Sequence, residues 1–194
     1  AGHSTIYELF NTRVRQAPSA IAIDHEGQIW TYAQLNDRVR RLSAIFSMPG
    51  IERGDRIVIL SENRPKYIVA ELACAMKGPI LACLNWRLTA AELEHCITLV
   101  EPKLFLVSSG ENEKNDELPL GDIKTLVLDK SLEKLMDDVA PDDPNPAVDP
   151  EDGVVILSGL LAHQEQFVLS AYREVGLSLV NRFKVENWTT LVVG

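Results

Sequence analysis

Residues 56–107 decide the fold, because three apolar runs alternate there with segments of helical pattern. The runs are Arg56-Ile57-Val58-Ile59-Leu60, Ile80-Leu81-Ala82-Cys83-Leu84 and Leu104-Phe105-Leu106-Val107. Runs without a polar face are typical of strands that are covered on both sides of a sheet. Together with the helices between them they predict an α/β fold with a parallel, doubly wound sheet. The loops at the carboxyl ends of the strands would then form a ligand crevice.

The helical segments between these runs carry start and stop signals. Pro65 fits the first position of a helix that continues to Lys77, and Gly78 follows at its end. Thr89 and Glu92 form a capping-box pattern, which predicts the start of the next helix.

The N-terminal region extends the pattern. Ser4 is expected to cap a helix over residues 5–16, and two short strands are expected around a turn at residues 25–28. Thr31 is expected to cap a second long helix.

An acidic, proline-rich segment divides the chain. Residues 141–150 contain four prolines, and residues 137–152 contain seven acidic side chains and no basic one. This composition predicts a stiff, extended, solvated linker. We therefore predict a first α/β subdomain over residues 1–140, with a strand at 123–128 and a short helix from Ser131, then a linker over 141–152.

The start of a second subdomain is predicted over residues 153–194. It opens with an apolar run that reaches Leu157, continues through Ser158-Gly159, and resumes at Leu160. This pattern predicts a hairpin that turns at Ser158-Gly159. A helix is expected from about His163 to Arg182, followed by a strand at residues 190–193.

Composition narrows the classes of function. The chain has 194 residues and a net charge of -9, with 46% apolar and 24% charged residues. No apolar run approaches the ~20 residues that span a bilayer, and no clustered basic face suggests nucleic-acid binding. Arg38, Arg40 and Arg41 are interpreted as the solvated face of a helix.

The cysteines do not form a metal-binding pattern. Cys74, Cys83 and Cys96 lack the C-x-x-C spacing, and each lies among apolar residues. They are interpreted as reduced core cysteines of a cytoplasmic protein, and no metal site is predicted.

Several segments, in their order and spacing, resemble the acyl-adenylate-forming enzymes. The resemblance covers essentially the whole chain and corresponds to roughly the first third of such an enzyme. The segments that carry it are Tyr7-Glu8-Leu9-Phe10, Trp30-Thr31-Tyr32-Ala33-Gln34-Leu35-Asn36, Gly54-Asp55-Arg56-Ile57-Val58-Ile59-Leu60, Asn63-Arg64-Pro65-Lys66-Tyr67, and Asn85-Trp86-Arg87-Leu88. The last of these is similar to an Asn-x-Arg-Leu signature of acyl- and aryl-CoA ligases.

The resemblance implies two half-reactions. A carboxylate attacks the α-phosphate of Mg-ATP to give an acyl-adenylate, and the thiol of CoA then displaces AMP. The implied cofactors are ATP, Mg²⁺ and CoA, and the implied partner is a small-molecule carboxylic acid. A homodimer is left open. As an N-terminal fragment of such a ligase, the chain alone is expected to be inactive, so no catalytic residue is assigned.

The resemblance also points to candidate binding residues. The family's glycine-rich ATP loop is here reduced to Ser158-Gly159, which offers only two backbone amides. Either the polypeptide lacks this loop, or the polypeptide contains loop residues that the given sequence omits. In the second case the intact mass would exceed that of the 194 residues. Ser158 and Gly159 are therefore either the edge of an ATP loop or a plain hairpin turn.

Two further residues match the family's pattern. His163 corresponds to a position after the ATP loop, with the alternative that it orders the start of a helix. Arg87 lies where CoA ligases approach the phosphates of CoA, and its guanidinium suits bidentate phosphate contact. The alternative is a surface arginine paired with an acid such as Glu92. Two alternative functions stay open: a non-catalytic α/β binding module on the same scaffold, and an amino-acid-activating domain.

Overall fold

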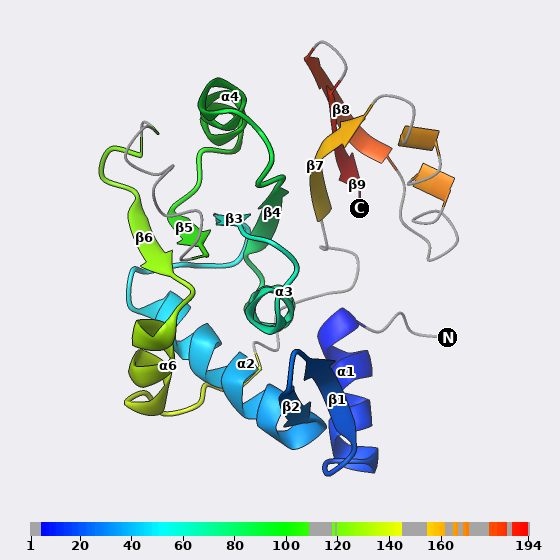
Figure 1. Cartoon of the computed structure of the whole chain (residues 1–194), viewed down its shortest axis with the longest axis vertical. Coiled ribbons are helices and arrows are strands. Elements are labelled where there is room, and N and C mark those ends of the chain that lie inside the picture. The colour runs from blue at the N-terminus through cyan, green and yellow to red at the C-terminus, as the bar shows by residue number, and fades with distance from the viewer. Residues whose placement is uncertain are drawn as a thin grey trace.

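The computed structural model describes residues 5–108, 118, 120–144, 155–161, 165–166, 169–170, 179–185 and 188–193. These residues form a seven-stranded sheet with the strand order β6-β5-β3-β4-β7-β9-β8 and a separate two-stranded sheet of β1 and β2 (Figure 1). The helices are α1 (Ile6–Gln16), α2 (Tyr32–Ser47), α3 (Pro65–Lys77), α4 (Ala90–Val100) and α6 (Lys130–Asp137). The strands are β1 (Ile21–His25), β2 (Gln28–Thr31), β3 (Arg56–Leu60), β4 (Ile80–Leu84), β5 (Leu104–Val107), β6 (Lys124–Val127), β7 (Val155–Leu161), β8 (Leu179–Val185) and β9 (Trp188–Val193).

The centre of the large sheet is parallel. β3 pairs with β4 on one side and with β5 on the other, and Leu60 lies level with Leu84 and Val107. β6 continues the parallel pairing beyond β5, and β7 continues it beyond β4. The three apolar runs are therefore the neighbouring central strands, as predicted.

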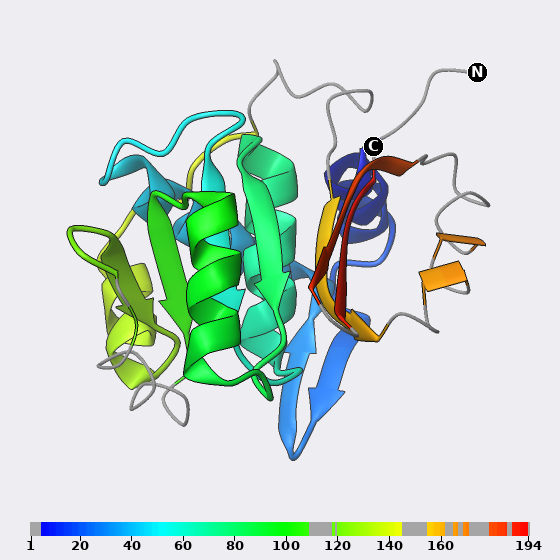
Figure 2. The ribbon, with the colours of Figure 1, turned by 90° about the horizontal axis from the view of Figure 1, so that it is seen from above.

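Alternate residues of β3 and β5 face two different hydrophobic cores. Ile57 and Leu106 belong to a core shared with α2, α3 and α6, whereas Val58 and Phe105 pack with α4. In Figure 2, α4 lies in front of the sheet. Helices on both faces make the sheet doubly wound, which confirms the predicted fold class. Among the described residues, no helix is long and apolar enough to cross a membrane.

The helix ends follow the local sequence signals with two adjustments. Thr31 and Thr89 cap α2 and α4 as predicted, and Gly78 ends α3 with a φ of 105°, a backbone conformation that suits glycine. The cap of α1 is Thr5, whose side chain accepts from the amide of Glu8, rather than Ser4. α6 is capped by Asp129, one residue before the helix begins at Lys130.

The predicted hairpin turn at Ser158-Gly159 is wrong. β7 runs without a turn from Val155 to Leu161, because the residues on both sides of Ser158-Gly159 pair with the same strand, β9. Leu157 pairs with Leu191 and Leu160 pairs with Thr189, so Ser158 and Gly159 together stand opposite one residue. This arrangement is a β-bulge, in which one strand contains an extra residue.

The predicted helix from about His163 to Arg182 is also wrong at its C-terminal end. Glu165, Gln166, Leu169 and Ser170 are helical, but β8 already begins at Leu179. β8 pairs antiparallel with β9, the next strand in the sequence. Strand pairing over Leu179–Val185 thus overrides the helical pattern.

The beginning of the predicted linker is bound to the first subdomain, although Pro141, Asp143 and Pro144 are exposed as predicted. Asp142 is bound to α2 and α3, and Arg40 binds its carbonyl. Arg41 instead donates to the carbonyls of Met136 and Val139, just before this segment, so neither arginine lies on a fully solvated face. Charge complementarity between the acidic segment and these helices explains the difference. The boundary at residues 141–152 stays a prediction. What the structure adds is that β7 continues the same sheet as β4.

Candidate functional site at the carboxyl edge of the sheet

The carboxyl ends of β3 and β4 form the switch point of the sheet. The chain leaves β3 toward α3, which packs on one face, and leaves β4 toward α4, which packs on the other. Loops that diverge in this way open a crevice where ligands of doubly wound folds bind. This rule places the expected crevice between residues 61–64 and residues 85–88.

Strand register brings Ser158-Gly159 to this edge. Cys83 of β4 lies level with Leu157 of β7, and the two strands run parallel. The next residue is Leu84 in β4 and Ser158 in β7, so these two residues lie at the same level of the sheet. The structure thus places the loop that contains Arg87 and the Ser158-Gly159 bulge at the same edge. His163 lies outside the described residues.

The loop that contains Arg87 is a tight turn. The Asn85 side-chain oxygen accepts from the Arg87 amide at 3.0 Å, and the Leu88 amide donates to the Asn85 carbonyl at 3.1 Å. The guanidinium of Arg87 lies 5.0 Å from the centre of the Trp86 ring. Arg87 is exposed, so its charge is available to an anion from solution. The Glu92 carboxylate accepts from the amide and hydroxyl of Thr89.

Two serines at this edge were not singled out from the sequence. Ser61 and Ser108 directly follow β3 and β5, both are buried, and the Ser108 amide donates to the carbonyl of Leu60. The Ser61 hydroxyl donates to the Glu62 carbonyl at 2.9 Å. The available signal was their position directly after two apolar runs, because parallel strands end at one edge.

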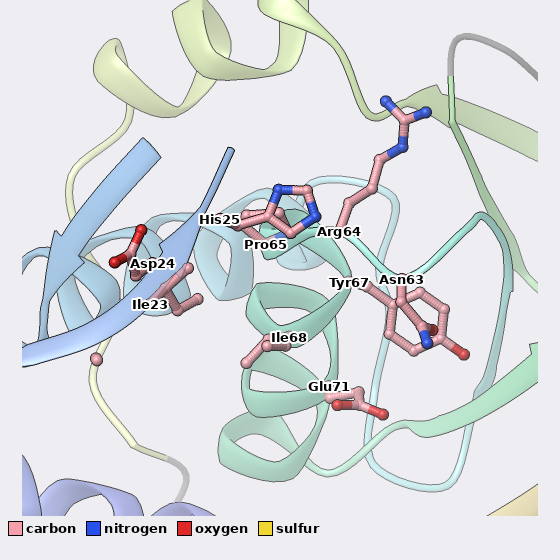
Figure 3. A pocket seen from close by; sticks show the side chains of 10 residues that line it. Ile23, Asp24, His25, Asn63, Arg64, Pro65, Tyr67, Ile68 and Glu71 are labelled. Atoms are coloured by element: carbon pink, nitrogen blue, oxygen red, sulfur yellow. The ribbon is translucent and has the colours of Figure 1, made fainter. Parts of the chain in front are cut away.

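A cavity of about 460 Å³ lies beside the crevice, between β1 and α3 (Figure 3). It shares Asn63 and Arg64 with the loop after β3, and Arg64 pairs with Glu62 at 3.0 Å. Arg87, the one suggested binding residue whose side chain the structure describes, does not line it. The residues around it are Ala22, Ile23, Asp24, His25, Asn63, Arg64, Pro65, Tyr67, Ile68 and Glu71.

Burial controls the ionisation of groups near this cavity. Desolvation raises the pKa of the Glu71 carboxyl above its ordinary value. It also raises the pKa of the Cys83 thiol to about 11, although a hydrogen bond with Tyr67 acts in the opposite direction. Cys83 is therefore protonated at neutral pH and is not a nucleophile in this state.

The described residues do not form a cradle for a triphosphate. Such a cradle needs several converging backbone amides and a neutralising cation. The backbone at Ser158-Gly159 is instead part of a strand. Among the described residues, no three His, Cys, Asp or Glu side chains gather as a metal site.

Comparison with known proteins gives the context for this geometry. A family model described as "AMP-binding enzyme" matches residues 10–157. A feruloyl-CoA synthase from Amycolatopsis sp is 39% identical over 85 residues, which are 44% of this chain and 17% of that protein. The fatty acid–[acyl-carrier-protein] ligase ScoC from Streptomyces coeruleorubidus is 27% identical over 123 residues, 63% of this chain and 24% of that protein.

The fold is shared with a solved N-terminal domain. The N-terminal domain of FACL13 from Mycobacterium tuberculosis superposes with a TM-score of 0.75 at 20% sequence identity, over 81% of this chain and 42% of that one. The matched part of this chain thus covers between 17% and 42% of the length of these proteins. Because the family match covers most of the chain, and the two sequence relatives are named as a feruloyl-CoA synthase and a fatty acid ligase, the resemblance in the sequence is confirmed. The chain belongs to the family of AMP-binding enzymes.

Proposed function

We propose that this chain is part of an ATP-dependent, AMP-forming acyl-CoA ligase. The observation that carries the proposal is the AMP-binding match over residues 10–157. The 39% identity to a feruloyl-CoA synthase favours CoA ligases within the family. The proposed substrate is a small carboxylic acid, and the proposed cofactors are ATP, Mg²⁺ and CoA. A cytoplasmic location belongs to the same proposal, and a homodimer is left open.

Arg87 is the residue we propose for contact with CoA. It is exposed at the carboxyl edge of β4, and the Trp86 ring supports its guanidinium from one side. A guanidinium held in this way can offer two parallel N–H groups to a phosphate. Ser158, Gly159 and His163 are proposed on family resemblance as the rim of an ATP site, although the strand geometry at Ser158-Gly159 does not itself support a phosphate loop.

The test of this role is calorimetric titration of the purified chain with CoA. We expect Arg87→Ala to weaken CoA binding about tenfold, the effect of losing one charge-assisted contact of about 1.4 kcal/mol. Arg15→Ala, an exposed arginine on α1, serves as the matched control and should bind as the wild type does. Equal affinity in the Arg87→Ala variant would remove Arg87 from the site.

The 194-residue chain alone is expected not to form acyl-adenylate, because the described edge lacks a triphosphate cradle. Incubation with Mg-ATP, ferulate and hydroxylamine would trap an adenylate as the hydroxamate. A hydroxamate signal that depends on ATP would overturn this expectation. The intact mass, measured on the same sample, shows whether residues beyond these 194 are present.

The second candidate function is a non-catalytic α/β binding module. The observation that favours it is the unbroken course of β7 from Val155 to Leu161, which contains no phosphate loop after Gly159. If titrations with both ATP and CoA show no binding, and the mass equals that of 194 residues, this second candidate is preferred.

A further inference from the structure

We propose that residues 139–143, named here the strap, form a releasable latch: they bind to α2 and α3, and this docking holds β7 against β4. The inference concerns conformation and goes beyond the proposed function. Its centre is Asp142, which contacts both helices.

The backbone of Asp142 binds Arg40 of α2 in two ways. The Asp142 amide donates to the Arg40 carbonyl at 3.1 Å, and the Arg40 Nε donates to the Asp142 carbonyl at 2.7 Å. A second nitrogen of the same guanidinium donates to the Asp143 carboxylate at 2.6 Å. One arginine therefore binds two consecutive residues of the strap, which fixes the register of the strap on α2.

The side chain of Asp142 connects this contact to α3. Its Oδ2 accepts from the Lys77 Nζ and, at 3.5 Å, from the hydroxyl of Ser43, which is fully buried on α2. Its Oδ1 accepts from the Asp143 amide at 2.9 Å. The exposed fractions of the Asp142 and Lys77 side chains are 29% and 21%, so solvent screens this pair only in part.

Arg41 holds the start of the strap. Its guanidinium is bound by Asp37 at 2.7 Å and donates to the carbonyls of Met136 and Val139 at 3.1 and 2.8 Å. These carbonyls lie at the end of α6, where a cation also complements the helix dipole. The strap is thus anchored at its first residue by Arg41 and near its last by Arg40 and Lys77.

The position of the strap explains why it bears on β7. Lys77 is the last residue of α3, and β4 begins at Ile80, so Asp142 is docked at the amino edge of the sheet. β7 runs parallel to β4 and must therefore start from this same edge. In the described residues the two strands are paired at Ala82–Ile156 and Cys83–Leu157, whereas β3 pairs with β4 along its whole length. Because only two described residue pairs join these strands, we expect the contact of β7 with β4 to depend on the docking of the strap at the same edge.

The charges that face Asp142 set its response to pH. Lys77 comes from α3, Arg40 from α2 and Asp143 from the strap itself, and Tyr7 of α1 lies within electrostatic reach of Arg40 and Asp143. Burial acts to raise the pKa of Asp142, but the hydrogen bonds and charge of Lys77 outweigh it and hold the pKa below the ordinary 3.8. The latch is therefore closed above this value and opens as pH falls through the lower folded pKa.

Hydrogen exchange followed by mass spectrometry tests the latch at pH 7. In the Asp142→Asn variant, we expect amides of the strap to exchange at least tenfold faster and amides of β7 several-fold faster. Amides of β3 and β5 should stay within twofold of the wild type. Lys77→Met should reproduce this pattern, and the double variant should exchange no faster than the faster single variant, because both changes remove one interaction.

A matched pair of variants separates the latch from general destabilisation. Asp55 accepts from Lys103 at 2.8 Å, so Asp55→Asn and Lys103→Met remove an ion pair that connects the starts of β3 and β5 and that includes no residue of the strap. These controls should leave exchange in the strap and β7 unchanged. Unchanged strap exchange in Asp142→Asn would overturn the docking, and a released strap with unchanged β7 exchange would overturn its coupling to β7. A uniform rise across all strands would also contradict the proposal.

Discussion

At the scale of single residues, burial makes two thiols unreactive. Desolvation raises the pKa of Cys74 well above its ordinary value and that of Cys83 to about 11. Alkylation needs the thiolate, so at pH 8 Cys83 should react with iodoacetamide about a hundredfold more slowly than an exposed thiol of pKa ~8.5. Mass spectrometry of each labelled cysteine, in the native state and in urea, measures the ratio. Fast native labelling of Cys83 would show that this site opens readily.

Asp129 is a second residue whose role is defined by local contacts. It caps α6, and its carboxylate accepts from the hydroxyl and the amide of Ser131. These bonds lower its pKa below the ordinary 3.8, with the Ser131 hydroxyl as the largest cause. Asp129→Ala should reduce the free energy of unfolding by about 1 kcal/mol at pH 7, whereas Asp129→Asn should change it by a few tenths.

The sign of the pH dependence follows from the lowered pKa of Asp129. The stabilisation is present above pH 3.8 and is lost as pH falls through the lower folded pKa. Urea unfolding at pH 7 and pH 3 should therefore show a smaller difference between wild type and Asp129→Ala at pH 3. An equal difference at both values would mean that the ionised carboxylate is not the stabilising form.

At the scale of elements, the bulge in β7 predicts an asymmetry between two deletions. Ser158 and Gly159 stand opposite one residue of β9, so deleting Gly159 would restore a regular ladder. We expect this deletion to change the free energy of unfolding by less than ~1 kcal/mol, because the paired residues keep their partners. Deleting Leu157 instead also removes the bulge, but it places Ser158 opposite Leu191, so an apolar side chain of the strand is lost and the cost should be several times greater. Equal losses in urea titrations would favour a two-residue hairpin turn.

The same elements show what the sequence could predict. β3, α3, β4 and α4 were predicted because each carries its own signals, such as Pro65, Gly78 and the Thr89–Glu92 box. The unbroken course of β7 and the strand β8 were not, because both depend on pairing with β9, which lies later in the chain. A glycine inside an apolar run fits a turn and a bulge equally well, and only the partner strand decides between them.

At the scale of the whole molecule, some features of the candidate site could be predicted from the sequence and others could not. The carboxyl edge that contains Arg87 was predictable, because parallel strands end together and their loops follow directly in sequence. The cavity between β1 and α3 was not, since Asp24 and Glu71 line one cavity only after the β1–β2 hairpin lies beside the helix. The docking of Asp142 could not be predicted for a related reason. The acidic composition of residues 137–152 does not show which basic side chains the segment contacts.

The whole molecule should open in two stages, because β4 and β7 are paired at fewer positions than the central strands of the sheet. β3 is fully buried from Ile57 to Leu60 and is paired on both sides, whereas β7 meets β4 at Ala82 and Cys83. Native-state hydrogen exchange at increasing urea should show amides of β7, β8 and β9 opening together, at a lower free energy than amides of β3 and β5. Their dependence on urea should also be weaker, since this opening exposes less surface than global unfolding. If all strands instead follow one isotherm, the sheet is a single cooperative unit, and the pairing of β4 with β7 is stronger than its short length indicates.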